Sequence, residues 1–309
     1  MHKYILRRIA LLLPVLIGVT FVVFTMLHIT PGDPARMALG EQAPQEAVDK
    51  LREEMGLNDP FFVQFGRYVY KGVFEQDLGR SYITKRPVSQ EIMNVFPTTL
   101  KLSALSMVIA VILGIPFGII SAVKQYSTFD SIVLIFAMIG ISMPVFWLGI
   151  LMILLFSVKL GLLPSSGFYS VKHMILPSVV LGAQSVAIIT RMTRSSMLEV
   201  IRQDFIRTVR AKGQRERKVI MRHALRNALI PVITVAGVQF GYLLGGAVLT
   251  EVIFSIPGVG RLMVESIKMR DYPIVQAGVL YIAVAFSFVN LMVDLLYAYV
   301  DPRIKAQYH

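Results

Sequence analysis

Basic side chains are the most concentrated chemical groups in this sequence. Between two apolar segments, residues 207–231 read RTVRAKGQRERKVIMRHALRNALIP. Guanidinium and ammonium groups at this density attract anionic lipid headgroups. Two interpretations are therefore open for the stretch: simple attraction to a membrane surface, or a shaped surface that docks another protein.

Side chains that make or break bonds are poorly represented. The chain has no cysteine, and its five histidines are scattered without the spacing of metal ligands. It also lacks the G-x-x-x-x-G-K-[ST] loop that cradles nucleotide phosphates, because Gly213 is followed by QRERKV. No nucleophile, base and oxyanion arrangement is recognisable. We therefore expect a non-catalytic chain with no metal site and no cofactor of its own.

The elements that position the basic stretch are strongly apolar. Of the 309 residues, 55% are hydrophobic and 16% are charged, unlike a soluble protein. A helix that spans a bilayer needs roughly 20 apolar residues. The sequence predicts an all-α polytopic membrane protein with six transmembrane helices, over residues 9–29, 97–123, 131–158, 174–190, 228–249 and 273–300.

Lysine and arginine in short loops predict the orientation. The N-terminus is basic through Lys3, Arg7 and Arg8, and so is the loop between the fourth and fifth spans, whereas residues 30–96 mix both signs of charge. With six spans, both termini and the basic loop lie on one side. We predict that this side is the cytoplasm and carries most of the net charge of +12.

The long segment after the first span has helical patterning of its own. The sequence TPGDPA ends the span, and residues 44–55 place Ala47, Val48, Leu51 and Met55 along one helix face before Gly56. The aromatic stretch NDPFFVQFGRYVYKGVF suits a headgroup region. We expect three regions: residues 1–29 with the first span, an external cap of interfacial helices over 30–96, and a core over 97–309.

The basic stretch is patterned as helix, glycine, helix. Ser196 and Glu199 fit a capping box, which predicts a new helix beginning there. Gly213 should end that helix, since glycine adopts the left-handed conformation without steric cost. Apolar residues recur along it at Leu198, Ile201, Phe205 and Val209. Such a stripe on a loop favours docking over simple attraction to lipid.

At this point the residues resemble a known family. RTVRAKG followed by RHALRNALIP is similar to the EAA loop of the membrane subunits of ATP-binding-cassette importers. TPGDPA, EMGLNDPFFVQF, DLGRSY, ISMPVFWLGILMILLFSV, TRSSMLEV, IPGVGRLMVESIKMRDYPIVQ and NLMVDLLYAYVDPRI extend the resemblance over nearly the whole chain, to the dipeptide, oligopeptide and nickel branch. The resemblance implies the type I importer permease fold and a heterodimer in which this chain is the member with the long outer segment.

The same resemblance implies a cytoplasmic coupling loop over residues 197–226 that inserts into an ATPase subunit. Its candidate contact residues are Phe205, Arg207, Thr208, Val209, Ala211, Lys212 and Gly213. The acidic first residue of the EAA pattern is Arg207 here, so a salt bridge from that position is not expected.

The resemblance also implies partners and a place in the cell. They are a second homologous permease, two ATP-binding-cassette ATPases that hold ATP and magnesium, an extracytoplasmic solute-binding protein and the lipid bilayer, with no nucleic acid. The chain would form half of a translocation pathway in a prokaryotic cytoplasmic membrane, with both termini in the cytoplasm. Its solute would be a dipeptide, an oligopeptide, glutathione or a nickel chelate.

Polar and small residues inside the spans are further candidates. Asp294 is expected to lock the last span to Arg191 or Arg194, because a carboxylate in a membrane needs a partner. Glu251, just outside the fifth span, is a candidate for meeting a cationic solute group at the outer mouth. The candidates for lining a polar pathway are Gln184, Ser185, Gln239 and Tyr242, and those for close helix packing or gating are Gly237, Gly241 and Gly245.

Two other functions remain open from the sequence. A self-sufficient channel or secondary transporter would need several buried ionisable groups, and Asp294 is the one that stands out. A membrane receptor or scaffold would use the basic loop to dock a cytoplasmic protein without moving a solute.

Overall fold

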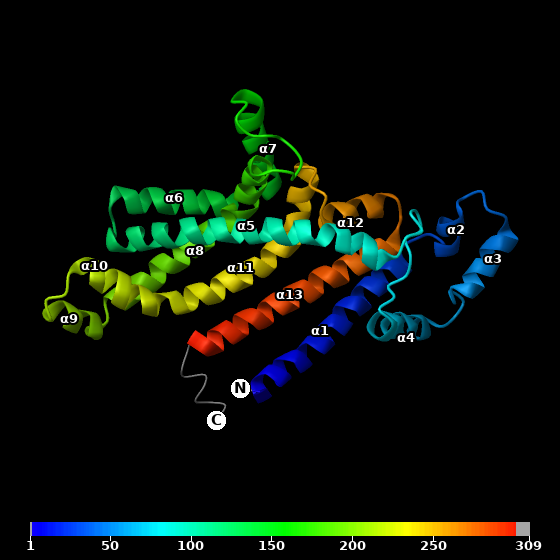
Figure 1. Ribbon diagram of the computed structural model, residues 1–309, viewed down its shortest axis with the longest axis horizontal. Helices are drawn as coiled ribbons and strands as arrows, with labels where there is room; N and C mark the ends of the chain where they lie inside the picture. Colours follow the sequence, from blue (N-terminus) through cyan, green and yellow to red (C-terminus); the bar gives the residue numbers. More distant parts are fainter. Residues whose placement is uncertain (1, 301–309) are drawn as a thin grey trace.

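The computed structural model describes residues 2–300, with side chains for residues 10–293 and 295. Apart from one isolated bridge between Arg80 and Pro87, the regular structure of this range is helical. Figure 1 shows a long bundle with α9 and α10 at one end and α2 and α3 at the other. We call these the basic end and the cap end. The long helices are α1 (His2–Ile29), α5 (Val88–Val123), α8 (Val171–Ile201), α11 (Leu225–Ile253) and α13 (Tyr272–Val300).

The predicted third span is broken in the middle. α6 (Thr128–Ser142) and the pair α7 (Val145–Met152) and η2 (Ile153–Lys159) are bent by 109°. Met143 is extended because Pro144 disfavours a helical conformation in the residue before it. In the described residues, five helices are long and apolar enough to cross a membrane, or six if this bent pair counts as one span. The helix is thus interrupted completely at Pro144, whereas α5 and α11 continue through Pro116 and Pro231.

The helix that contains the predicted second span begins before residue 97, because α5 starts at Val88. Val88 and Ile92 are fully buried against Val259 and Ile274, so apolar packing extends this helix beyond the length that a bilayer needs.

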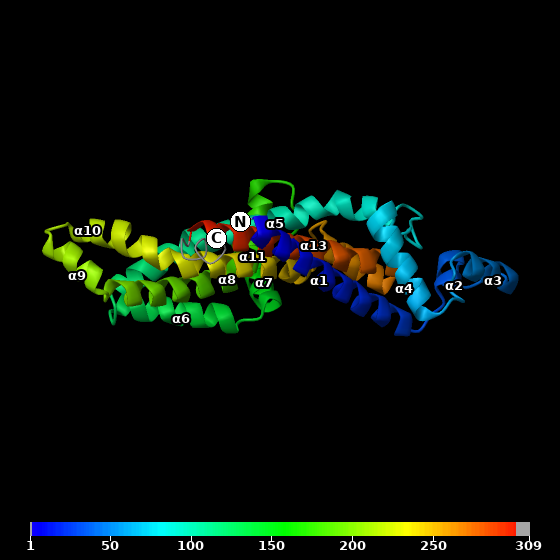
Figure 2. The same cartoon turned by 90° about the horizontal axis from the view of Figure 1, so that it is seen from below.

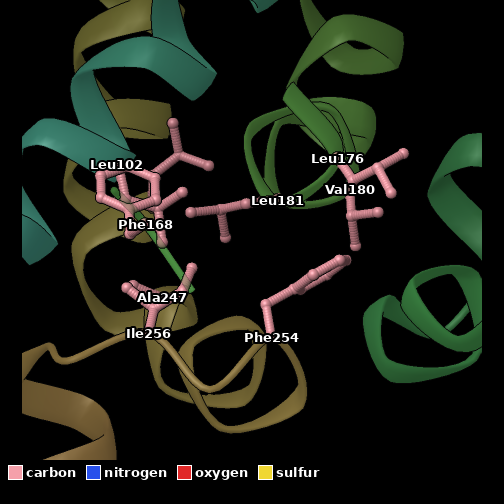
Figure 3. Packing of buried hydrophobic residues seen from close by; sticks show 9 residues of the cluster. Leu102, Phe168, Leu176, Val180, Leu181, Ala247, Phe254 and Ile256 are labelled. Atoms are coloured by element: carbon pink, nitrogen blue, oxygen red, sulfur yellow. The ribbon is translucent and has the colours of Figure 1, made fainter. Parts of the chain in front are cut away.

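Glycines let α5 approach α8 closely. A Cβ at Gly118 would lie 2.5 Å from Cβ of Thr193, and one at Gly182 would lie 2.8 Å from the carbonyl oxygen of Ser106. Towards the cap end, a cluster that includes Leu102, Leu181 and Phe254 fills the space between α5, α8 and α11 (Figure 3). The bundle therefore combines close backbone approach in one part with large apolar side chains in another.

The predicted glycine repeat of α11 is only partly a packing surface. Side chains of α13 crowd Gly237 and Gly241, namely Val293 and Phe286, whereas a Cβ at Gly245 would meet nothing within 4 Å in this chain. Packing or gating at Gly245 therefore stays a prediction, since no atom of the described chain would contact a Cβ at this position.

The cap is helical, as the sequence predicts. It contains α2 (Pro34–Leu39), α3 (Gln45–Glu54), α4 (Phe61–Tyr70) and the short π-helical turn η1 (Lys71–Glu75), and α2 and α3 extend past the end of α1 (Figure 2). The aromatic face of α4 packs on α1, where the rings of Phe21 and Phe65 are 5.3 Å apart and those of Phe24 and Phe61 are 5.4 Å apart. Much of the aromatic surface predicted for lipid headgroups thus contacts the first span.

A buried carboxylate ties the end of the cap to the core. Asp271, between α12 (Val259–Lys268) and α13, accepts hydrogen bonds from Oγ of Ser81 and, at 2.9 Å, from the backbone N–H of Tyr82. Burial, together with the nearby Asp271 charge, raises the pKa of Tyr82 to about 12. The tyrosine therefore stays neutral at physiological pH.

The close approach of α5 and α8 predicts unequal effects of adding one methyl group. Gly118→Ala should lower the free energy of unfolding by about 1–3 kcal/mol, because the new Cβ overpacks against Thr193. Gly245→Ala, in open space, should be neutral or slightly stabilising because alanine favours helix. Thermal unfolding of both purified variants in lipid nanodiscs measures this difference, and equal melting temperatures would contradict it.

Candidate functional site

The candidate site is the helical hairpin at the basic end. α9 (Asp204–Ala211) follows α8 after a short turn, and α10 (Glu216–Lys218) and η3 (Val219–Ala224) lead into α11. The predicted helix start at Ser196 is wrong, since α8 is continuous to Ile201 and Ser196 is buried within it. The new helix starts instead after Gln203.

Ile206 anchors α9 to the bundle. Its side chain is fully buried and packs in one cluster with Met197 of α8 and with Val219, Ile220 and Ala224 of η3. The sequence analysis assigned the apolar face to Phe205 and Val209 on the assumption of one continuous helix. The break at Arg202 and Gln203 rotates the face, so that Ile206 points inward and Phe205 is exposed.

Gly213 ends α9 as the sequence predicts. Its φ is +73°, in the left-handed region, and its N–H donates to the carbonyl of Arg210 at 2.9 Å. Across this turn, Arg210 donates two hydrogen bonds to the carboxylate of Glu216, at 2.6 and 3.1 Å. Because both side chains are partly exposed, the pair shapes the turn more than it stabilises the fold.

The predicted coupling residues form the outer surface of this hairpin. Phe205, Arg207, Thr208, Ala211, Lys212 and Gly213 are exposed, and Val209 is half-buried. Beside them lies a surface hollow of about 510 Å³, lined by Gly213 and by the basic side chains of Arg215, Arg217, Lys218 and Arg222. The hairpin thus offers a rigid, basic surface with an exposed aromatic side chain.

A buried ion pair that the sequence analysis missed supports the hairpin. Asp130, in the first turn of α6, receives hydrogen bonds from Nε and Nη2 of Arg194 on α8, at 2.7 and 2.8 Å. Ser121 of α5 and the backbone N–H of Tyr126 also donate to this carboxylate. Donors from α5, from the turn before α6 and from α8 therefore meet at Asp130. The donor on α8, Arg194, lies about two turns before the end of that helix.

The pair bears on one expectation about the last span. The sequence analysis offered Arg191 or Arg194 as the partner of Asp294, and the guanidinium of Arg194 is engaged by Asp130 instead. The side chain of Asp294 lies outside the described residues. Sequence reasoning treated Asp130 as a loop residue before a span, and its one distinguishing signal was the N-cap pattern formed with Ser127, whose Oγ accepts from the Asp130 N–H at 3.2 Å.

The structure brings two of the predicted pathway residues together. Ser185 of α8 donates a hydrogen bond of 3.2 Å to Oε1 of Gln239 on α11. Gln184 and Tyr242 are exposed and do not share this contact. The hydrogen bond between Ser185 and Gln239 joins two long helices. A solute-lining role for all four residues stays a prediction.

Glu251 does not lie where the sequence analysis placed it. It belongs to α11 and is completely buried, accepting hydrogen bonds from Oγ1 of Thr99 at 2.6 Å and from the backbone N–H of Arg261 at 3.0 Å. Thr99 in turn accepts from the N–H of Val259 at 2.9 Å. The expected position at an outer mouth is wrong, because this carboxylate satisfies the N-terminus of α12.

In the described part of the chain, no group of three or more histidine, aspartate or glutamate side chains could hold a metal ion. The acidic groups described above are instead bonded to arginine, hydroxyl and backbone donors.

The fold is shared with chains of two solved structures. The chain superposes on a subunit of the MetNI methionine ABC transporter in inward-facing conformations with a TM-score of 0.56 and 21% identity, covering 68% of this chain and 95% of that one. A structure of an amino acid ABC transporter with histidines gives a TM-score of 0.52 at 15% identity, covering 70% and 94%. At these identities the likenesses show a shared fold.

Sequence comparison identifies the family. Residues 114–306 match the family described as "Binding-protein-dependent transport system inner membrane component", and residues 1–103 match its N-terminal region. The chain belongs to this family and is a permease subunit. It is 48% identical to the dipeptide transport system permease protein DppB of Alkalihalophilus pseudofirmus, covering 99% of this chain and 100% of that one. It is 45% identical to the glutathione transport system permease protein GsiC of Escherichia coli, covering 99% of both chains.

The buried ion pair predicts a large loss of stability when one partner is neutralised. Asp130→Asn should lower the free energy of unfolding by about 3–5 kcal/mol, because Arg194 then keeps a largely buried charge without its counter-charge. The double variant Asp130→Asn with Arg194→Gln should lose less than the sum of the two single variants. Thermal unfolding in nanodiscs measures both effects.

Glu265→Gln is the matched control, since Glu265 forms an exposed pair with Arg261. It should change stability by less than about 1 kcal/mol. A loss at Asp130 no greater than that at Glu265 would contradict the supporting role of the buried pair.

Proposed function

We propose that the chain forms half of the translocation pathway of an ATP-driven importer for dipeptides or closely related short peptides. The observation that carries the proposal is the hairpin at the basic end, where α9 is exposed outward and fixed inward by Ile206. The named functions of relatives, dipeptide and glutathione transport, support a peptide-like solute.

The chain needs an external source of energy. Shifting a two-state equilibrium from 1:99 to 99:1 takes roughly 5.5 kcal/mol of differential binding. We propose that two ATPase subunits, which hold ATP and magnesium, supply this free energy. One of them binds the hairpin of this chain. Because α9 is packed against α8 and η3, a force on its exposed face moves these helices together.

The remaining partners follow from the two ends of the bundle. A second, homologous permease completes the pathway, and a solute-binding protein delivers the solute to the cap. The basic end lies in the cytoplasm, as the positive-inside rule requires, so the cap lies outside. The contact residues of the hairpin are Phe205, Arg207, Thr208, Val209, Ala211, Lys212 and Gly213.

A self-sufficient secondary transporter is less well supported. Proton or ion coupling uses buried ionisable groups that change partners. Of the acidic residues whose side chains are described, Asp130 is held by Arg194 and Glu251 by Thr99 and the start of α12. These groups fix helices in place.

Docking through the hairpin predicts a selective effect of valine at Gly213. Gly213→Val should abolish co-purification of the ATPase subunits and ATP-dependent import of a labelled dipeptide by the reconstituted complex. A β-branched side chain at φ +73° costs about 1–3 kcal/mol of strain, which α9 relieves by losing its C-terminal turn. The control is Gly161→Val, at φ +61° and equally open but in the turn before α8. It should retain the ATPases.

The two outcomes that would overturn the proposal differ in meaning. Full retention of the ATPase subunits by Gly213→Val would show that the hairpin is not the docking site. Import by the wild-type chain that is driven by a proton gradient, without ATP or partner ATPases, would replace the importer function with secondary transport.

A further inference from the structure

One face of α8 carries exposed polar side chains inside the membrane-spanning bundle. Gln184, Arg191 and Ser195 are exposed, and with Ile188 between them they follow the helical spacing i, i+4, i+7 and i+11. Arginine in a span faces water, another protein group or a polar cavity, because hydrocarbon does not solvate its charge. This face therefore requires a polar neighbour.

A cavity of about 490 Å³ opens on this face between α6, α8 and α11. Its polar side chains are Arg191, Arg194 and Ser195, and apolar residues such as Leu134, Ile141 and Val235 form the rest of its wall. Its volume lies in the range of small-molecule sites, roughly 300–1,000 Å³. By contrast, the cavity of about 840 Å³ between α5, α11 and α13 is almost entirely apolar.

The charges around the smaller cavity are unbalanced. The carboxylate of Asp130 compensates the guanidinium of Arg194. Among the side chains that the structure describes, no carboxylate lines the cavity and none forms an ion pair with Arg191. Within this part of the chain, Arg191 therefore places one positive charge in the cavity without a counter-charge, one turn of α8 further from the hairpin than Arg194.

We propose that Arg191 binds the carboxylate of the transported solute in this cavity, on the hairpin side of the bundle. The assignment rests on the proposed importer function and restricts its solutes to those that carry an anionic group. Arginine suits this contact better than lysine, because its planar guanidinium group donates two parallel hydrogen bonds to a carboxylate. Ser195 and Gln184, on the same helix face, offer neutral hydrogen bonds along the path.

The absence of cysteine in the chain allows a direct test of the charge. In the reconstituted complex with all partner subunits, Arg191→Cys should lower dipeptide import at sub-saturating concentration about tenfold, because the charge-assisted contact to the carboxylate is lost. Subunit recovery and ATP hydrolysis without solute should stay unchanged. A cationic methanethiosulfonate reagent should then restore import, and an anionic one should not.

Lys172→Cys is the matched control, since Lys172 is an exposed cation on the same helix but does not line the cavity. It should import like the wild type with either reagent, and the treated wild-type complex reports any effect on cysteines of the partner subunits. Unchanged import by Arg191→Cys, rescue by both reagents alike or by neither, or a parallel loss of ATP hydrolysis and assembly would overturn the assignment. A wild-type complex that imports no dipeptide would overturn the proposed function itself, and the carboxylate site with it.

Discussion

The buried ion pair between Asp130 and Arg194 is the constraint on which the basic end depends. It joins the end of α5, the turn into α6 and the part of α8 nearest the hairpin at a single carboxylate. A charge pair at this position is directional, so it fixes the helices more specifically than apolar contact would. The position of the hairpin is set by the end of α8, from which α9 follows. Ile206 then packs α9 against α8 and η3.

The cap end uses the same physical device with different donors. Glu251 receives hydrogen bonds from α5 and from the first turn of α12, and Asp271 receives them from the segment after the cap helices. Each carboxylate therefore joins segments that are distant in sequence. Between the two ends, glycines let α5 and α8 approach closely, so the two helices are in direct backbone contact there.

Particular residues show why some features were predictable. Gly213 was identified because a left-handed turn after a helix has a strong local preference for glycine. Glu251 and Asp130 were missed or misplaced because their roles depend on partners far along the chain, such as Thr99 and Arg194. Ile206 was missed because a break of two residues separates α8 from α9. The apolar periodicity of α8 therefore does not continue into α9, and it cannot predict which side of α9 faces inward.

The sequence by itself determined that this is a helical membrane protein with a basic hairpin, and where that hairpin turns. These properties follow from hydropathy, charge and local backbone preference, each of which acts over a few neighbouring residues. Only the tertiary structure decided which carboxylates are satisfied internally and that Arg191 is left facing a cavity without a described counter-charge. The physical reason is that hydrogen bonds and ion pairs act over a few ångströms in space, and the fold sets those distances.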